Sequence, residues 1–117
     1  MTEECAGAAC FRLLGKKWTA FIVWALLDGP KRFTALLEAA PGVRDRVLSQ
    51  RLKELEAAGI VTRSQYLEVP PRVEYELTAK GQGLLPIIDA MRSFGHEWLV
   101  EEHGHTHEVP ATERAAI

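Results

Sequence analysis

The sequence lacks the features by which membrane, secreted and disulfide-stabilised proteins are recognised. Its longest apolar run, residues 20–27, has eight residues, whereas a membrane-spanning helix needs about twenty. Its two cysteines, Cys5 and Cys10, are too few for a disulfide scaffold and are typical of a reducing compartment. The first residues contain neither the basic region nor the apolar segment of a signal peptide. We therefore expect a cytoplasmic protein without a membrane partner.

Motifs for catalysis and cofactor binding are also missing. The sequence contains no glycine-rich phosphate loop and no pair of carboxylates at a plausible spacing, and Ser49 has no histidine in the same segment to activate it. Three of the four histidines, His103, His105 and His107, alternate along a polar segment that has no cysteine nearby. We expect a protein that is not an enzyme, has no cofactor and has no specific metal site.

The sequence does contain a regular order of short helices. Its length of 117 residues leaves room for one compact domain. Apolar residues at helical spacing, with glycine and proline between the segments, predict helices over residues 5–14, 17–28, 34–40 and 45–58. Thr34 is the expected N-cap of the third helix. The last two helices are joined by a short Pro-Gly turn, which is the arrangement of a helix-turn-helix.

A β-hairpin is predicted directly after these helices. Residues 60–67 and 72–77 have the β-branched content or the alternation of strands, and Pro70 and Pro71 between them have no N–H to donate to a sheet. Thr78 is the expected cap of a long final helix. The expected fold is therefore α+β, mainly α: a winged helix-turn-helix with a β-hairpin wing and a long C-terminal dimerisation helix.

Domain boundaries follow from the same pattern. Residues 1–102 are expected to form a single DNA-binding and dimerisation domain. Residues 103–117 are polar and aperiodic, and we expect a flexible tail there. Pro86 lies inside the final helix, where it predicts a kink or a restart.

The helix over residues 45–58 has two faces of different chemistry. Its apolar stripe consists of Val47, Leu48, Leu52 and Leu55. Side chains suited to the major groove lie opposite, at the spacing i, i+3, i+4 and i+7: Arg46, Ser49, Gln50 and Lys53. Arg44 lies at the helix entrance, where it is expected to meet a phosphate. Any exposed helix carries polar residues, but the position of this one after the turn and before the hairpin favours DNA binding.

The distribution of charge supports this interpretation. The chain carries a formal net charge of -2, which by itself argues against nucleic acid as a partner. Residues 12–80, however, contain twelve basic and eight acidic residues, so the predicted DNA-binding segment carries a charge of +4. Arg63 and Arg72 flank the hairpin loop, where a wing places them against phosphates or the minor groove.

The final helix has more apolar surface than a small monomer can bury. Its large apolar side chains include Ile87, Ile88, Met91, Phe94 and Trp98. An exposed stripe of this width marks an interface, and a two-fold dimer would present two recognition helices to a pseudo-palindromic operator. The alternative is a helix that folds back onto its own domain.

Several segments resemble the HxlR-type winged helix-turn-helix regulators of bacteria. They are Gly15-Lys16-Lys17-Trp18-Thr19, Leu27-Asp28-Gly29-Pro30-Lys31-Arg32-Phe33, residues 47–56 and residues 69–75. The resemblance implies a homodimeric transcriptional regulator that binds double-stranded DNA near its own or neighbouring genes, and we expect it to be a repressor. It also implies dimerisation through the first and last helices, which would bring Phe11 and Leu14 into the interface.

The resemblance further implies a candidate redox switch. Some members sense electrophiles or oxidants through a cysteine thirteen residues before the motif tryptophan, and counting back from Trp18 gives Cys5. A helix N-terminus would stabilise its thiolate, whereas Glu3 and Glu4 would oppose it. The family usually has Cys-Pro where this chain has Cys5-Ala6. An unreactive thiol is the alternative, and Cys10 is expected to fill space in the core.

A second departure from the family lies at the recognition helix. Arg44 occupies the position where the family commonly has a serine cap, so Asp45 becomes the candidate cap one residue later. Two other functions remain open at this point. The first is a winged-helix module for protein–protein contact. The second is a regulator controlled by a small ligand rather than by thiol chemistry, in which Trp18 and Trp24 line the ligand cavity.

Overall fold

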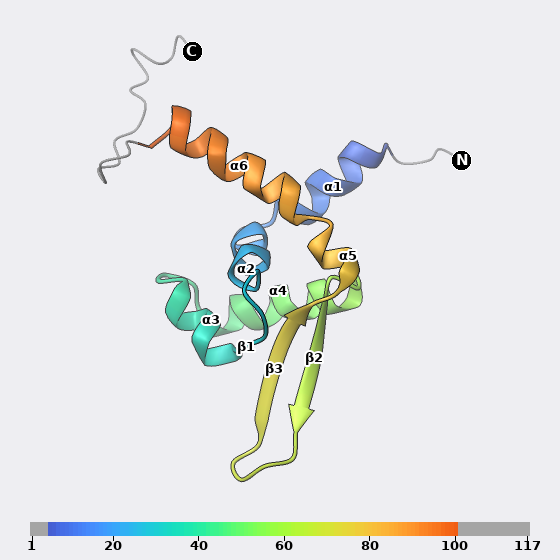
Figure 1. Ribbon diagram of the computed structural model, residues 1–117, viewed down its shortest axis with the longest axis vertical. Coiled ribbons are helices and arrows are strands. Elements are labelled where there is room, and N and C mark those ends of the chain that lie inside the picture. The colour runs from blue at the N-terminus through green and yellow to red at the C-terminus, as the bar shows by residue number, and fades with distance from the viewer. Residues whose placement is uncertain (1–4, 101–117) are drawn as a thin grey trace. The chain divides into compact units, whose positions relative to one another are not determined.

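The computed structural model describes residues 5–100 (Figure 1). By its internal contacts the chain divides into two units, Met1–Leu85 and Pro86–Ile117. The first unit carries all but one of the described helices and all the described strands. The tail predicted at residues 103–117 lies outside the described residues. No helix within the described part of the chain is long and apolar enough to cross a membrane.

Four of the predicted helices are present in the first unit, with changed ends. They are α1 (Ala6–Leu14), α2 (Thr19–Ala25), α3 (Phe33–Ala39) and α4 (Asp45–Ala57). The prediction that the second helix spans residues 17–28 was wrong at both ends. Trp18 has a left-handed backbone with φ of 75°, which a helix cannot include. After Ala25 the chain passes into turns.

The predicted cap of α3 was also wrong. Arg32 occupies the N-cap position with extended backbone, and Thr34 lies inside the helix. The reason is a short strand that the sequence did not predict, β1 (Lys31–Arg32), which leads directly into α3. Gly29 takes φ of 130° before it, a conformation that favours glycine.

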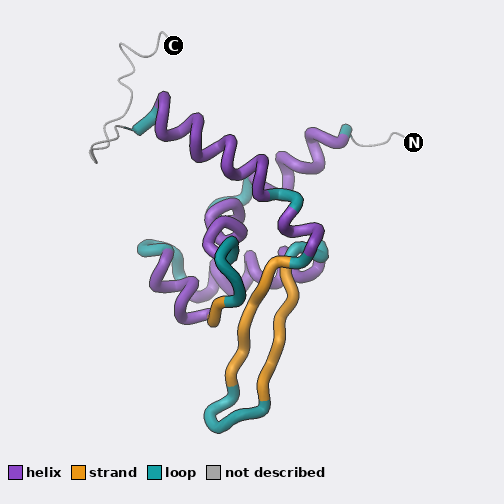
Figure 2. Tube along the Cα trace, viewed as in Figure 1, coloured by secondary structure: helices purple, strands orange, loops and turns teal. Residues whose placement is uncertain are grey.

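The strands form one antiparallel sheet in the order β1-β3-β2. The predicted hairpin is confirmed: β2 (Val61–Tyr66) pairs with β3 (Arg72–Leu77) over their full length, from Val61 opposite Leu77 to Tyr66 opposite Arg72. The unpredicted β1 pairs with the other edge of β3, with Lys31 opposite Tyr75. Figure 2 shows the two long strands extending beyond the helices of the first unit, so that their loop forms the tip of a wing.

The core of the first unit is built largely from α2, α4 and the base of the hairpin. Ile22 and Val23 of α2 are at most 2% exposed, and Val61 and Leu77 close the core from the sheet. The predicted stripe of α4 is confirmed at its three leucines, because Leu48, Leu52 and Leu55 are at most 1% exposed. Val47 is half-buried. Burial of apolar surface stabilises the folded state by about 25 cal/mol per Å². Burial of this stripe therefore holds α4 in one rotation about its axis.

The predicted restart of the final helix is confirmed. Thr78 caps the short helix α5 (Ala79–Gln82), because its Oγ1 accepts a hydrogen bond of 3.0 Å from the backbone N–H of Gly81. A new helix, α6 (Leu85–Trp98), then begins with Pro86 in its first turn, where the missing N–H of proline costs no helical hydrogen bond.

Candidate nucleic-acid interface

The helices α3 and α4 and the turn between them have the geometry of a helix-turn-helix. Gly42 has φ of 104° in that turn, a backbone conformation that side-chain-bearing residues rarely adopt. The backbone N–H of Val43 donates to the carbonyl of Ala40 at 3.0 Å and tightens the connection. Arg44 then occupies the N-cap position with extended backbone and without a side-chain cap. The candidate cap Asp45 is instead the first helical residue, where its charge favours the positive end of the helix.

The face of α4 opposite the buried leucines is open to solvent. Arg46, Gln50 and Lys53 are exposed, and Arg44 is exposed at the entrance to the helix. Ser49 is half-buried, so it lies at the edge of this face rather than at its centre. The arrangement presents two cations and an amide along one side of a helix of 13 residues. Such a helix fits the width of a major groove.

A carboxylate on α4 gathers three side chains around it. Glu54 Oε2 accepts a hydrogen bond of 3.0 Å from Gln50 Nε2, and Arg51 Nη1 lies 3.3 Å from Glu54 Oε1. Lys16 Nζ, from the turn between α1 and α2, lies 3.4 Å from Glu54 Oε2. The hydrogen bond from Gln50, followed by the hydrogen bond and charge of Lys16 and the charge of Arg51, holds the pKa of Glu54 below its usual value.

The turn between α1 and α2 therefore contacts the recognition helix. Besides the Lys16 ion pair, Arg51 Nε donates to the backbone carbonyl of Lys17 at 2.9 Å. The Trp18 ring packs edge-on against Phe21, with ring centroids 5.9 Å apart, and its edge faces Gly42. Sequence reasoning missed this set of contacts. The i, i+3 spacing of Arg51 and Glu54 was visible in the sequence. The contact of this pair with a turn about 35 residues away was not.

The wing carries one arginine that is exposed to solvent and one that is paired with carboxylates. Arg63 is exposed on β2. Arg72 Nη2 lies 2.9 Å from Glu68 Oε2, and Arg72 Nη1 lies 2.6 Å from Glu74 Oε2. The Arg72 guanidinium carbon stacks over the Tyr66 ring, 4.1 Å from the ring centroid. The hydrogen bonds that Arg72 donates to Glu68 and then to Glu74 raise the pKa of its guanidinium above the usual value. The two arginines that flank the loop thus differ in what they offer a phosphate.

Cys5 lies at the N-cap position of α1 and is exposed. The backbone N–H groups of Ala8 and then Gly7 lower the pKa of its thiol, which is the effect expected from a helix N-terminus. Cys10 is half-buried, and both thiols are free.

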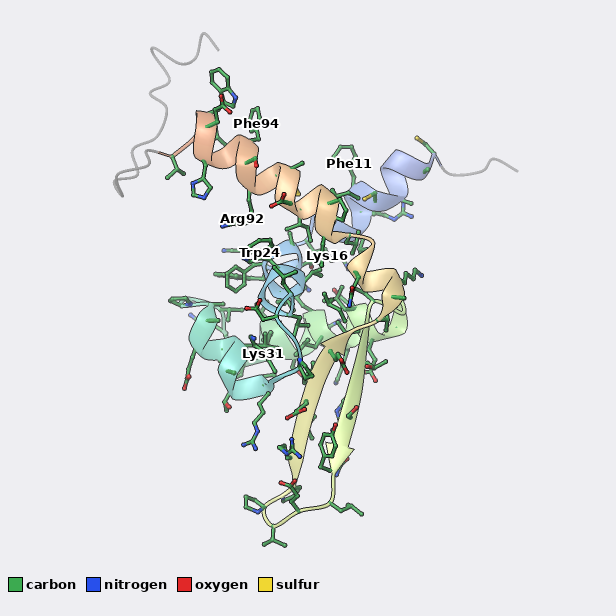
Figure 3. All side chains as sticks on the ribbon, viewed as in Figure 1. Phe11, Lys16, Trp24, Lys31, Arg92 and Phe94 are labelled. Carbon is green, nitrogen blue, oxygen red and sulfur yellow. The ribbon has the colours of Figure 1, made fainter. Side chains whose placement is uncertain are left out.

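The helix α6 has an apolar face that is open to solvent. Ile87, Met91, Phe94 and Trp98 are between 42% and 57% exposed, and Figure 3 shows the Phe94 ring projecting from the helix. Ile88 differs from the other predicted interface residues because it is only 2% exposed within the single chain. On α1, Phe11 is 79% exposed, whereas Leu14 is half-buried.

No group of histidine, cysteine or acidic side chains among residues 5–100 is arranged to hold a metal ion. His96 is the histidine in this range and is exposed. The alternating histidines of the sequence lie outside the described residues.

Comparison with known proteins adds a family to this geometry. The family model described as HxlR-like helix-turn-helix matches residues 13–103. YvaP of Bacillus subtilis, named as an uncharacterized HTH-type transcriptional regulator, is 46% identical over 87 residues, which cover 74% of this chain and 81% of YvaP.

Two solved structures share the fold. The reduced form of the redox regulator HypR matches with a TM-score of 0.75 and 38% identity, covering 78% of this chain and 90% of HypR. The reduced form of the transcriptional regulator YodB from B. subtilis matches with a TM-score of 0.72 and 38% identity, covering 88% of this chain and 100% of YodB.

Replacing Glu54 with glutamine tests the contacts around the recognition helix. We expect Glu54→Gln to lower the free energy of unfolding by about 1 kcal/mol at neutral pH, because Lys16 and Arg51 lose their carboxylate. The pKa of Glu54 is depressed in the folded state, so its contribution is fully present above the ordinary glutamate pKa and is lost as pH falls through the folded value.

Urea unfolding at neutral and acidic pH measures this effect. The parent and Glu54→Gln should become equally stable in acid. Glu56→Gln is the control, since Glu56 is an exposed glutamate of the same helix and its replacement should change stability by less than about 0.5 kcal/mol. A Glu54→Gln deficit that stays constant across this pH range would contradict the assignment.

Proposed function

The chain belongs to the HxlR-like helix-turn-helix family of transcriptional regulators, and from this we propose that it is a repressor that binds a pseudo-palindromic operator as a homodimer. The observation that carries the proposal is the outward face of α4, with Arg46, Gln50 and Lys53 exposed opposite three buried leucines. Proteins of this family are DNA-binding regulators rather than enzymes.

The recognition helix reads DNA through a few side chains. Arg46 donates two hydrogen bonds to a guanine in the major groove. Gln50 gives up its hydrogen bond to Glu54 and pairs with an adenine instead. Arg44 and Lys53 contact phosphates, with Ser49 at the edge of the helix. Within residues 5–100, Arg46 and Lys53 have no ion-pair partner that would have to be displaced. We therefore assign the largest share of base discrimination to Arg46.

The wing has a supporting role. Arg63 is free to lie along the phosphates or the minor groove beside the recognition helix. Arg72 was predicted to do the same, but Glu68 and Glu74 already neutralise its charge. Arg72 contacts DNA only if the phosphates of the DNA backbone compete with these carboxylates. Its main role is therefore to hold the two strands of the wing together.

Dimerisation follows from the apolar face of α6. Ile87, Met91, Phe94 and Trp98 repeat at i, i+4, i+7 and i+11, which places them on one side of the helix. A second copy would cover this stripe, with Phe11 of α1 as a further contact. Ile88 is already buried within the chain, so it supports this surface from inside the molecule and is not exposed on it. A dimer seated on an operator represses by occupying the DNA that polymerase needs.

Replacing Arg46 tests the proposed base contact. On DNA from upstream of its own gene, Arg46→Ala should weaken binding by about 10-fold to 100-fold and relax the preference at one base pair of each half-site. Fluorescence anisotropy titrations of the parent and the variant at several salt concentrations measure this. Binding by the parent should weaken steeply as salt rises.

The control is Arg92→Ala, which makes the same chemical change on α6. Its operator affinity should stay within about twofold of the parent. If the affinity were insensitive to salt, or if Arg46→Ala bound as well as the parent, α4 would not be a DNA-reading helix. A winged-helix module for protein contact would then be the better interpretation.

We further propose that Cys5 switches the regulator. Its thiol is exposed at the N-cap of α1, and the lowered pKa increases the fraction of the reactive thiolate. HypR is a redox regulator with reduced and oxidized forms, and YodB has been treated with diamide. The thiolate adds to the β-carbon of an electron-poor alkene to form a thioether, while the electron pair of the C=C π bond moves to the adjacent carbon, which takes up a proton from water. Alternatively, two thiols of the dimer form a disulfide while an oxidant takes up their two electrons and two protons.

Treatment with diamide tests the switch. The parent should run as a cross-linked dimer on a non-reducing gel and lose operator affinity, whereas Cys5→Ser should remain monomeric on the gel and keep its affinity. Cys10→Ser identifies the second thiol, because a retained cross-link joins two copies of Cys5. If Cys5→Ser cross-links like the parent, or if oxidation leaves operator affinity unchanged, control by a small ligand replaces control by a thiol.

A further inference from the structure

The loop at the tip of the wing is apolar and open to solvent. It spans residues 67–71, between β2 and β3, and Figure 2 shows it beyond the helices of the first unit. Leu67 is 93% exposed and Val69 is 100% exposed, more than any other large apolar side chain among residues 5–100. Two exposed prolines follow them. A cluster of exposed apolar side chains marks an interaction site, and the wing tip is such a cluster.

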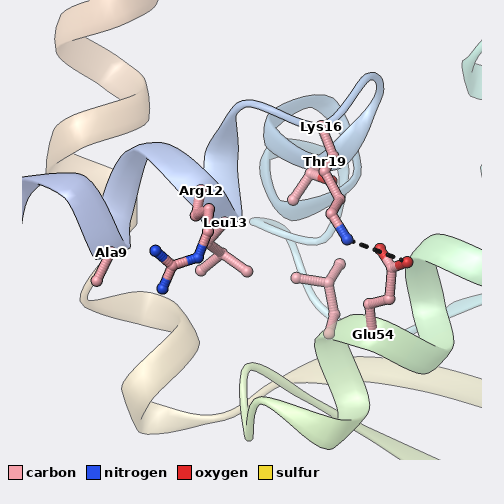
Figure 4. Close-up of a pocket in the computed structure, with 7 residues that line it drawn as sticks. Ala9, Arg12, Leu13, Lys16, Thr19 and Glu54 are labelled. Atoms are coloured by element: carbon pink, nitrogen blue, oxygen red, sulfur yellow. Dashed lines mark ion pairs between the residues drawn. The ribbon is translucent and has the colours of Figure 1, made fainter. Parts of the chain in front are cut away.

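The charged side chains around the tip are paired within the chain, as the ion pair in Figure 4 illustrates for α4. Arg72 holds Glu68 on one side and Glu74 on the other. Arg32 of β1 lies opposite Glu74 in the sheet. The hydrogen bond and charge of Arg72, and then the charge of Arg32, lower the pKa of Glu68. Two arginines thus balance two glutamates, so these side chains carry no net charge that would repel phosphates.

The tip is held in one conformation from both sides. Pro70 and Pro71 fix their own backbone φ angles. Where the two strands end, Tyr66 lies opposite Arg72 in the sheet, and the guanidinium stacks 4.1 Å from the centroid of the Tyr66 ring. A loop that is already ordered loses little conformational entropy when it binds. The tip is therefore pre-organised for its partner.

The length of the wing matches the distance between two grooves of DNA. The strand β2 has six residues, which span about 20 Å at about 3.3 Å per residue. Residues 58–60 connect it directly to the end of α4. One helical turn of B-DNA is about 34 Å long, so the centre of a minor groove lies about 17 Å along the duplex from the centre of the major groove. With α4 in the major groove, the tip reaches the neighbouring minor groove.

We propose that Leu67 and Val69 enter this minor groove as an apolar wedge, partly unstack one base step beside each half-site and bend the operator. The inference rests on the proposed function, because it needs α4 in the major groove. Apolar wedges of this kind bend a duplex by about 20–90° toward the major groove. Flexible pyrimidine–purine steps are the easiest to unstack. The wedge therefore gives the regulator a sequence preference at a step where no side chain reads a base by hydrogen bonding.

Permanganate oxidation of the operator complex tests the insertion, because this reagent attacks thymines that are unstacked. On DNA from upstream of its own gene, the parent should make thymines reactive at a flexible step beside each half-site, about five base pairs from the guanines that α4 contacts. Energy transfer between dyes at the two ends of the DNA measures the bend in parallel. The bend should be at least about 20° at each half-site.

Variants of the tip identify the wedge. Leu67→Ser combined with Val69→Ser should abolish thymine reactivity and the bend, and should weaken operator binding about threefold to tenfold, since polar side chains gain less from leaving water. Leu67→Met combined with Val69→Ile keeps the apolar volume and should behave like the parent. Leu27→Ser is the control, because Leu27 is an exposed leucine outside the wing. All variants should unfold at the same urea concentration, since they change exposed side chains.

The outcomes separate the wedge from the function on which it rests. If the parent binds the operator but leaves every thymine stacked and the DNA straight, the wedge is overturned while reading by α4 stands. The same holds if the double serine variant bends the DNA as the parent does, and a partner protein is then the better candidate to cover the tip. If the parent does not bind the operator, the proposed function fails and the wedge fails with it.

Discussion

Three leucines on one side of α4 determine which side of that helix meets solvent. Leu48, Leu52 and Leu55 are removed from water almost completely, and rotating the helix would expose them at a cost of about 2 kcal/mol for each side chain. The polar residues at the intervening positions must therefore point outward. The proposed reading of DNA depends on this constraint, because Arg46 and Gln50 are held in place by what lies on the opposite side of their own helix.

The Glu54 contacts add a connection that burial alone does not supply. Through Lys16 and Arg51 the turn after α1 contacts the recognition helix, and Trp18 extends the same turn to Gly42. Cys5 lies at the start of α1. The thiol switch that we propose therefore acts on the helix that leads into the turn in contact with α4.

Hydrophobic periodicity was enough to predict the helices, the hairpin and the faces of α4, because these follow from local spacing. It failed where a tertiary contact or a special backbone conformation decides. The left-handed Trp18 shortened α2, and the two-residue strand β1 has too little sequence to carry a pattern. The same limit applied to the site. Exposed Arg46 was predictable from the wheel, but the partners of Arg72 and the approach of Lys16 to Glu54 depend on how distant segments meet.

Protection of operator guanines from methylation by dimethyl sulfate tests the central claim most directly, because the reagent attacks guanine N7 in the major groove. If the outward face of α4 reads the groove in a two-fold dimer, bound protein should protect guanines in two half-sites about ten base pairs apart, centre to centre. Protection of the DNA backbone from hydroxyl radicals, with every guanine N7 still reactive, would contradict the account.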